Sequence, residues 1–173
     1  MWYVVQVKAC HEQEIVNKCQ GIVKDGEEVF TILSERMARK DGEWEKVRSV
    51  TFQKYIFVET AEPDDFRERL RKIPGMTKLL KVGDDIVSIY PEEEKLLRLL
   101  GGDDHVIGSS VVYKEGDSVT VVSGALVGLE GLVRWSDKRQ KWIGIEVKLA
   151  NRKTVIKIGA EFISPSEKKL LSP

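Results

Sequence analysis

Cysteine and histidine are scarce in this chain: its 173 residues contain two of each. If Cys10 and Cys19 share a helix, they lie about 13 Å apart along its axis, which is too far for a disulfide. We therefore expect free thiols and a cytoplasmic protein. Cys10, His11 and Cys19 could in principle hold a metal, but no paired Cys-x-x-Cys spacing occurs. Neither a metal nor a cofactor is expected.

Long hydrophobic runs are also missing, since none approaches the roughly 20 residues of a membrane span. The opening "MWYVVQVK" lacks the basic flank and the cleavage site of a signal peptide. The sequence contains no phosphate-binding loop and no nucleophile motif, and His11 and His105 lie in separate regions. These absences predict a soluble, monomeric protein that has no membrane partner and is not an enzyme.

The net charge is zero, yet the charges are unevenly distributed. Between Arg134 and Lys157 eight basic residues stand against two acidic ones, so this segment carries +6 and the remainder carries −6. Such a split indicates a local basic surface despite the neutral total.

Strand-like and helical patterns alternate over the first hundred residues. Strands are predicted at 2–7, 28–33, 52–60 and 77–82, and helices at 11–20, 63–72 and 91–102. Asp41-Gly42 predicts the turn of a hairpin that is polar on both faces and projects from the body or lies along its edge. This order is typical of an α+β sandwich in which helices pack on an antiparallel sheet, here over residues 1–101.

Residues 102–111 mix glycine, aspartate and serine without periodicity, as an interdomain linker does. From 112 to 173 the pattern consists of short strands and tight turns. Ile143, Ile145, Val147 and Leu149 alternate with polar residues, which predicts a small SH3-like β-barrel. Three glycines at 124, 128 and 131 are expected where the chain turns between the first two strands.

The barrel region resembles the KOW motif of NusG-type transcription factors and some ribosomal proteins. The matching positions are Gly116-Asp117, Val119, Val121, Gly124, Gly128, Gly131 and Val133. The front of the chain resembles the NusG family independently, through "WYVVQ" at 2–6, "FQKYIFV" at 52–58 and "IPGM" at 73–76. The resemblance covers essentially the whole chain in the family's domain order, with Gln53-Lys54 replacing the usual proline-glycine pair.

The resemblance implies that the N-terminal (NGN) domain binds the clamp helices of bacterial RNA polymerase through an apolar pocket. Carried over by position, Phe52, Tyr55 and Phe57 would line that pocket with Trp2 behind them, although the same aromatics could simply be core residues. Lys8, His11 and Lys18 lie near where relatives meet non-template DNA. A solvated helix face explains those three equally well.

In housekeeping NusG proteins, a turn of the KOW barrel carries an apolar pair that contacts Rho or a ribosomal protein. Here the turn reads "LANRK" at 149–153, with Ala150 at the aromatic position. Lysine and arginine contact phosphates, and tryptophan stacks unpaired bases, so the barrel is predicted to bind RNA. The predicted RNA-binding residues are Trp135, Lys138, Arg139, Lys141, Trp142, Lys148, Arg152, Lys153 and Lys157. A soluble barrel with charged turns is the alternative.

This combination is most similar to the specialised LoaP-type members of the family, which act as antiterminators and recognise a hairpin in the leader of the nascent RNA. Two alternatives stay open: a housekeeping NusG that ties transcription to Rho or the ribosome, and a structural KOW-type RNA-binding or ribosomal protein. The C-terminal strands show no competing helical periodicity, so no refolding of the barrel into helices is expected.

Overall fold

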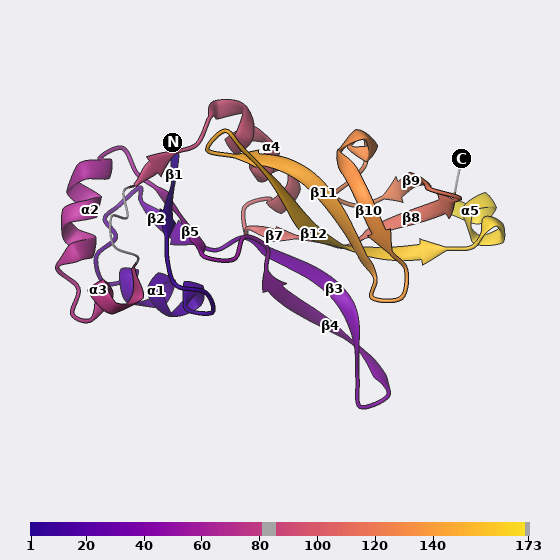
Figure 1. Ribbon diagram of the computed structural model, residues 1–173, viewed down its shortest axis with the longest axis horizontal. Coiled ribbons are helices and arrows are strands. Elements are labelled where there is room, and N and C mark those ends of the chain that lie inside the picture. The colour runs from indigo at the N-terminus through magenta and orange to yellow at the C-terminus, as the bar shows by residue number, and fades with distance from the viewer. Residues whose placement is uncertain (81–85, 172–173) are drawn as a thin grey trace.

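The computed structural model describes residues 1–80 and 86–171, which form an N-terminal α+β unit and a C-terminal barrel at opposite ends of an elongated molecule (Figure 1). Its N-terminal elements are β1 (Trp2–Gln6), α1 (Glu12–Cys19), β2 (Glu28–Phe30), β3 (Leu33–Lys40), β4 (Glu43–Val50), β5 (Tyr55–Glu59), α2 (Pro63–Arg71), α3 (Met76–Leu79), β6 (Val87–Ser88), α4 (Pro91–Gly101) and β7 (Val106–Ile107). The main sheet has the order β2-β5-β1-β6, and its pairs are antiparallel.

One face of this sheet packs on the helices α1 and α2. Ile15 of α1 and Phe66 of α2 are fully buried against Ile56 of β5 and form a core of their own. The helices begin where predicted: proline opens α2 and α4, and the acidic residues that follow favour the positive end of each helix dipole. The predicted α+β sandwich is confirmed.

One predicted strand, at 77–82, is wrong over the part that the structure describes. Residues Met76–Leu79 form the short helix α3, and Leu80 makes an isolated bridge with Val7. The left-handed Gly75 (φ +81°) turns the chain so that Met76 points into the core beside α1 and α2. A short apolar run fits a helical turn as well as a strand, so packing decided the outcome. Residues 81 and 82 of that prediction lie outside the described part.

The hairpin predicted at Asp41-Gly42 is confirmed as β3–β4, paired over its full length from Leu33↔Val50 to Lys40↔Glu43. Both turn residues have positive φ (+51° and +83°), as a two-residue hairpin turn requires. The hairpin tip projects from the body, whereas the base of β3 pairs in parallel with β7 (Figure 1).

The C-terminal unit is the predicted SH3-like barrel. Its elements are β8 (Ser110–Glu115), β9 (Ser118–Ser123), the 3-10 turn η1 (Glu130–Leu132), β10 (Val133–Asp137), β11 (Trp142–Leu149), β12 (Arg152–Ile163) and a terminal helix α5 (Pro165–Leu171). The strand order is β10-β11-β12-β8-β9, and the odd-numbered residues of β11 from Ile143 to Leu149 are buried as the alternation predicts. Gly124 has φ +100°, and a Cβ there would lie 2.6 Å from the Cα of Ser110, so only glycine fits.

The segment 102–111 is not a loose tether in this arrangement. It contains β7 and the start of β8, and its Ile107 is fully buried. The imidazole of His105 stacks on Phe30 with 3.6 Å between ring centroids. Within residues 1–80 and 86–171 no helix is both long and apolar enough to cross a membrane.

Candidate functional site

An aromatic cluster lies on the face of the N-terminal sheet opposite α1 and α2. The ring centroid of Trp2 lies 4.8 Å from Phe30 and 6.1 Å from Phe57, and Phe52 meets Phe57 edge-on at 5.4 Å. Strand alternation places Trp2 and Phe57 on the same sheet face, because β1 and β5 are antiparallel neighbours. The fold therefore brings together three of the four residues expected to contact a polymerase.

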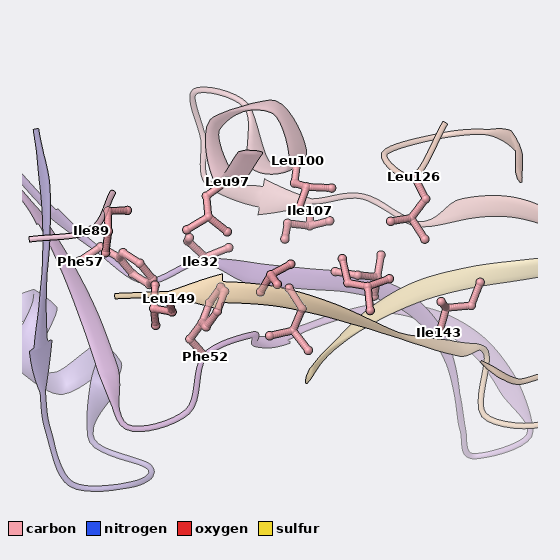
Figure 2. Close-up of a cluster of buried hydrophobic side chains, with 14 of the residues drawn as sticks. Ile32, Phe52, Phe57, Ile89, Leu97, Leu100, Ile107, Leu126, Ile143 and Leu149 are labelled. Carbon is pink, nitrogen blue, oxygen red and sulfur yellow. The ribbon is translucent and has the colours of Figure 1, made fainter. Parts of the chain in front are cut away.

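The barrel covers this cluster. Trp2, Phe52 and Phe57 are buried in one continuous core with barrel residues such as Val147 and Leu149 of β11. Figure 2 shows Leu149 beside Phe52 and Phe57. Tyr55 is half-buried at the edge of the cluster. In this arrangement the aromatics are core residues between the two units, and the barrel covers them.

A buried carboxylate holds the tip of the barrel on the N-terminal unit. Glu93 in the first turn of α4 accepts hydrogen bonds from the backbone N–H groups of Ala150 (2.9 Å) and Asn151 (3.0 Å). Its Oε1 also accepts the N–H of Tyr90 at 3.0 Å, which caps α4. Ala150 and Asn151 form the β11–β12 turn, both with positive φ. The turn expected to contact Rho or the ribosome in housekeeping relatives is thus docked internally.

The β3–β4 hairpin makes a second contact with the barrel, across β12. The Oγ of Ser34 donates to the carbonyl of Lys157 at 2.8 Å. Nearby, β3 crosses Gly159 so closely that a Cβ there would lie 2.1 Å from the carbonyl oxygen of Glu35. Only a glycine permits this approach of two backbones. The guanidinium of Arg36 then lies 4.6 Å from the ring centroid of Trp142.

A cleft of about 480 Å³ remains beside these contacts. It is lined by the loop before β5, including Gln53, by Tyr55 at the start of β5, and by residues 154–157 of β12. Its walls belong to both units, so the cleft would change if the barrel moved.

The outer face of β10, β11 and β12 gathers basic side chains. In the strand register, Trp135 lies opposite Gly144, which lies opposite Lys157. Further along the sheet toward the β11–β12 turn, Lys148 lies opposite Lys153. Glu146 on the same face is already engaged, by Arg134 at 3.4 Å and by Lys153 at 3.9 Å.

The structure divides the predicted RNA-binding residues into an exposed set and a covered pair. The exposed residues are Trp135, Lys138, Arg139, Lys148, Arg152, Lys153 and Lys157. Trp142 is only 7% exposed beneath Arg36, so it is not free to stack on a base in this arrangement. The ammonium of Lys141 pairs with Glu161 at 2.7 Å and lies 4.1 Å from the ring centroid of Trp44 in the hairpin.

Two of the three residues expected near DNA flank one carboxylate. His11 Nδ1 lies 2.9 Å from Glu14, and Lys18 Nζ lies 3.6 Å from it. These contacts lower the pKa of Glu14, the hydrogen bond with His11 most strongly. The third residue, Lys8, is exposed. The solvated-face interpretation therefore accounts for two of the three.

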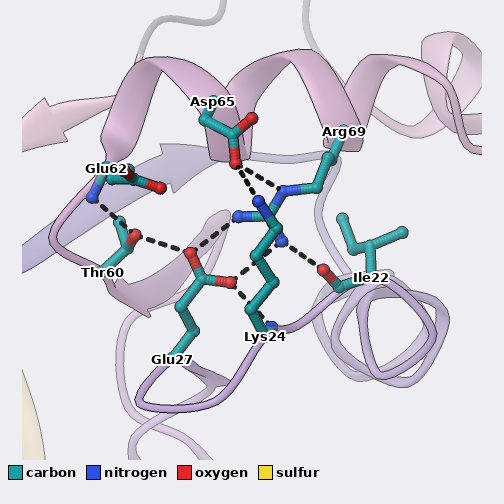
Figure 3. Close-up of polar contacts among 7 residues, drawn as sticks. All are labelled: Ile22, Lys24, Glu27, Thr60, Glu62, Asp65 and Arg69. Atoms are coloured by element: carbon teal, nitrogen blue, oxygen red, sulfur yellow. Dashed lines mark hydrogen bonds and ion pairs between the residues drawn. The ribbon is translucent and has the colours of Figure 1, made fainter.

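A separate ionic network ties α2 to the loop before β2 (Figure 3). The guanidinium of Arg69 makes two parallel hydrogen bonds to Glu27, at 2.7 and 2.9 Å, and also donates to the carbonyl of Ile22. Glu27 accepts further hydrogen bonds from Thr60 Oγ1 and from the N–H of Lys24. Arg69 above all lowers the pKa of Glu27 to about 2. The network is fully paired, so we assign it to stability.

The two cysteines are free thiols that differ in exposure. Cys10 is an exposed free thiol, whereas burial raises the pKa of the Cys19 thiol to about 12. Among the described residues no group of three or more potential metal ligands occurs.

Lys54, where the family usually has glycine, adopts φ +71°, and its N–H donates to the carboxylate of Glu12 at 2.8 Å.

The model of the family described as "Transcription termination factor nusG" matches residues 1–98, more than half of the chain. The chain belongs to the NusG family. It is 26% identical over 172 residues to the transcription termination/antitermination protein NusG of Thermus thermophilus, covering 91% of this chain and 94% of that protein. A solved structure described as "Domain interaction in Thermotoga maritima NusG" is 20% identical, covers 91% of this chain and 92% of that one, and superposes with a TM-score of 0.48.

NusG proteins are transcription elongation and termination factors that interact with RNA polymerase. The chain is therefore a transcription factor of this family, and the match over 1–98 disfavours a purely structural ribosomal KOW protein.

The sequence patterns did not identify Glu93 and Gly159, at which the N-terminal unit and the barrel contact each other closely. In the sequence Glu93 is only one of three acids that favour the start of α4. A signal did exist at Gly159, since a glycine inside a strand often marks a close backbone approach.

Proposed function

We propose that this protein is a transcription elongation and antitermination factor whose N-terminal unit binds the clamp helices of RNA polymerase and whose barrel binds a structured leader in the nascent RNA. The observation that carries the RNA part is the outer face of β10–β12, where Lys148, Lys153 and Lys157 gather beside the exposed Trp135. Glu146 on that face is neutralised by its own ion pairs.

The polymerase would bind through Trp2, Phe52, Tyr55 and Phe57. Aromatic side chains clustered on one sheet face are suitable anchors for a helix of a partner. Because Leu149 and Val147 cover three of these four residues, polymerase binding requires the barrel to move away. The apparent affinity for polymerase is then the affinity of the open form multiplied by the fraction of molecules that are open.

The two contacts support each other when they act on one transcript. Once the barrel holds the leader RNA, the N-terminal unit is confined near the polymerase that made it, which raises its effective concentration. The bound N-terminal unit would hold the clamp closed and oppose pausing and hairpin-induced release. Lys8, His11 and Lys18 are the proposed contacts to non-template DNA, with Lys8 the most available.

A housekeeping role that couples transcription to Rho or the ribosome is the second candidate. It would use the β11–β12 turn, where Ala150 provides little apolar surface and Asn151 follows it. Because Glu93 holds this turn, such a contact also requires the barrel to separate from the N-terminal unit.

The test is single-round transcription in vitro across an intrinsic terminator, with bacterial RNA polymerase and templates with or without the native upstream leader. We expect readthrough to rise only on the template with the leader. The triple variant Lys148→Ala, Arg152→Ala and Lys153→Ala should lose this effect and weaken RNA binding with a flatter salt dependence. Readthrough unchanged or reduced on both templates would contradict antitermination and favour the housekeeping role.

A further inference from the structure

We propose that Trp135 and the groove beside it form a site for one unpaired base of single-stranded RNA, with Lys114 and Lys157 contacting the flanking phosphates. This inference rests on the proposed function in one respect: it takes RNA as the ligand of the barrel. It goes further by naming the binding face, the stacking residue and a lysine, Lys114, that sequence reasoning did not select.

The indole of Trp135 lies across a backbone that has no side chain. A Cβ on Gly144, its partner in β11, would lie 2.2 Å from both Cε2 and Nε1 of the indole. The ring is therefore supported from beneath by strand β11 itself. Its outward side remains accessible, since Trp135 is 38% exposed. An aromatic ring held in place and open on one side provides a stacking surface, and base stacking tolerates different bases because every base has a π-face.

A groove of about 330 Å³ adjoins the ring. One wall comes from β8, β9 and the turn between them, through Lys114, Val119 and Asp117, and the other comes from β10 between Val133 and Ser136. The groove therefore lies where the first and last strands of the sheet order face each other. It is open and polar enough for a single nucleotide, whereas the paired bases of a duplex cannot leave their stack to reach the ring.

Two lysines near the ring are available for phosphates. Lys114 and Lys157 are both exposed and form no ion pair within the described residues, and Lys157 lies on β12 opposite Gly144. Arg134, which also lines the groove, is paired with Glu146. Lys148 and Lys153 continue the basic surface toward the β11–β12 turn. Asp117, on the same wall as Lys114, disfavours a phosphate inside the groove itself. The base would therefore occupy the groove, and the flanking phosphates would lie outside it, at Lys114 and Lys157.

The other tryptophans do not provide such a platform. Trp2 is fully buried and Trp142 is covered by Arg36. Trp44 is 46% exposed, but Lys141 and Arg39 of this chain already lie against its ring. Trp135 is also uncovered while the barrel is docked, so the site can be tested in the full-length protein as it stands.

The experiment measures fluorescence anisotropy of a labelled short oligoadenylate and of a blunt RNA duplex of equal length, both titrated with full-length protein at several salt concentrations. Trp135→Leu, which keeps an apolar cover over Gly144, should weaken oligoadenylate binding about 10-fold and leave duplex binding unchanged. Trp135→Phe should keep most of the affinity. Lys114→Ala, a substitution of an exposed side chain, should lower the salt dependence of oligoadenylate binding by about one phosphate contact.

Trp44→Leu is the matched control, because it removes the other exposed tryptophan and should not change either affinity. If the wild-type protein binds oligoadenylate and Trp135→Leu binds it equally well, the site is wrong while the proposed RNA function stands. If Trp135→Leu loses affinity equally for oligoadenylate and for the duplex, base stacking on Trp135 is also refuted. If the wild-type protein does not bind oligoadenylate, the single-base site is refuted, whereas the proposed RNA function is decided separately by the transcription assay with the native leader.

Discussion

Substituting Gly159 by alanine should open the molecule without disturbing either unit. A Cβ at this position would lie 2.1 Å from the carbonyl oxygen of Glu35 and 2.9 Å from the Cβ of Arg36, so β3 must retreat from β12 by roughly an ångström to restore ordinary contact. Gly159 is on the outer face of the barrel, and the three atoms nearest to the new methyl group all belong to the hairpin. Overpacking of this kind costs about 1–3 kcal/mol.

The cost falls on the closed arrangement, because the three closest contacts of the methyl group are lost once the hairpin has left. The population of open molecules should therefore rise about 5- to 150-fold, since each 1.4 kcal/mol corresponds to a factor of ten. Separation of the units breaks the hydrogen bonds from the amides of Ala150 and Asn151 to Glu93. Their hydrogen exchange reports the opening equilibrium directly.

The assay is amide hydrogen exchange on the full-length protein, followed at Ala150 and Asn151. Gly131→Ala is the matched control, since a Cβ at Gly131 meets nothing within 4 Å and this glycine does not have positive φ. We expect faster exchange in Gly159→Ala than in the wild type and in the control, together with tighter binding to RNA polymerase. Equal exchange rates in the three proteins would refute the idea that the β3–β12 contact holds the units together.

Four further predictions concern single residues. Glu93→Gln removes one charged acceptor from the amides of the β11–β12 turn and should speed amide hydrogen exchange at that turn, whereas Glu92→Gln, at an exposed position, should not. Equal exchange rates in the two variants would show that Glu93 does not hold the turn on the N-terminal unit. Lys54→Gly should stabilise the protein by about 1 kcal/mol in urea unfolding, because glycine adopts positive φ without strain; a loss would mean that the lysine side chain contributes more than the strain costs. The folded-state pKa of Glu27 lies near 2, below its ordinary value of 4.5, so its ion pair stabilises the protein above pH 4.5 and is lost as the pH falls toward 2. Glu27→Gln should therefore remove about 2 kcal/mol of the stability measured above pH 4.5, after allowance for solvent screening, together with its dependence on pH. An unchanged dependence of unfolding free energy on pH in this variant would contradict the prediction. A thiol reagent at neutral pH should modify the exposed Cys10 in the native state and reach Cys19 only after unfolding, as intact-mass measurements would reveal.

Under the proposed function, the docked barrel competes with polymerase for the same aromatic residues. If Trp2, Phe52 and Phe57 bind a polymerase helix, they cannot contact the barrel at the same time, so any ligand that favours the open state would also favour polymerase binding. The size of this coupling is limited by the free energy that separates the closed from the open arrangement. The Gly159→Ala variant changes that free energy without touching the aromatic residues.

Local sequence patterns determined most of the secondary structure. The alternation from Ile143 to Leu149 specified a strand with one buried face, and Asp41-Gly42 specified a tight hairpin turn. Proline and acids at Pro63 and Pro91 fixed the starts of two helices. Each of these signals depends on neighbours within a few residues, so the sequence carries it directly. The short run after Gly75 failed because packing of Met76 outweighed a weak local preference.

Only the tertiary structure decided what covers the aromatic residues. The sequence indicates that Phe52 and Phe57 are apolar and share a face, but burial by a partner and burial by the protein's own barrel require the same pattern. In the same way, Trp135 and Trp142 look alike in the sequence, and the crossing of β3 over Gly159 leaves one exposed and covers the other. Contacts between distant segments depend on how the two units pack, and no local periodicity records that packing.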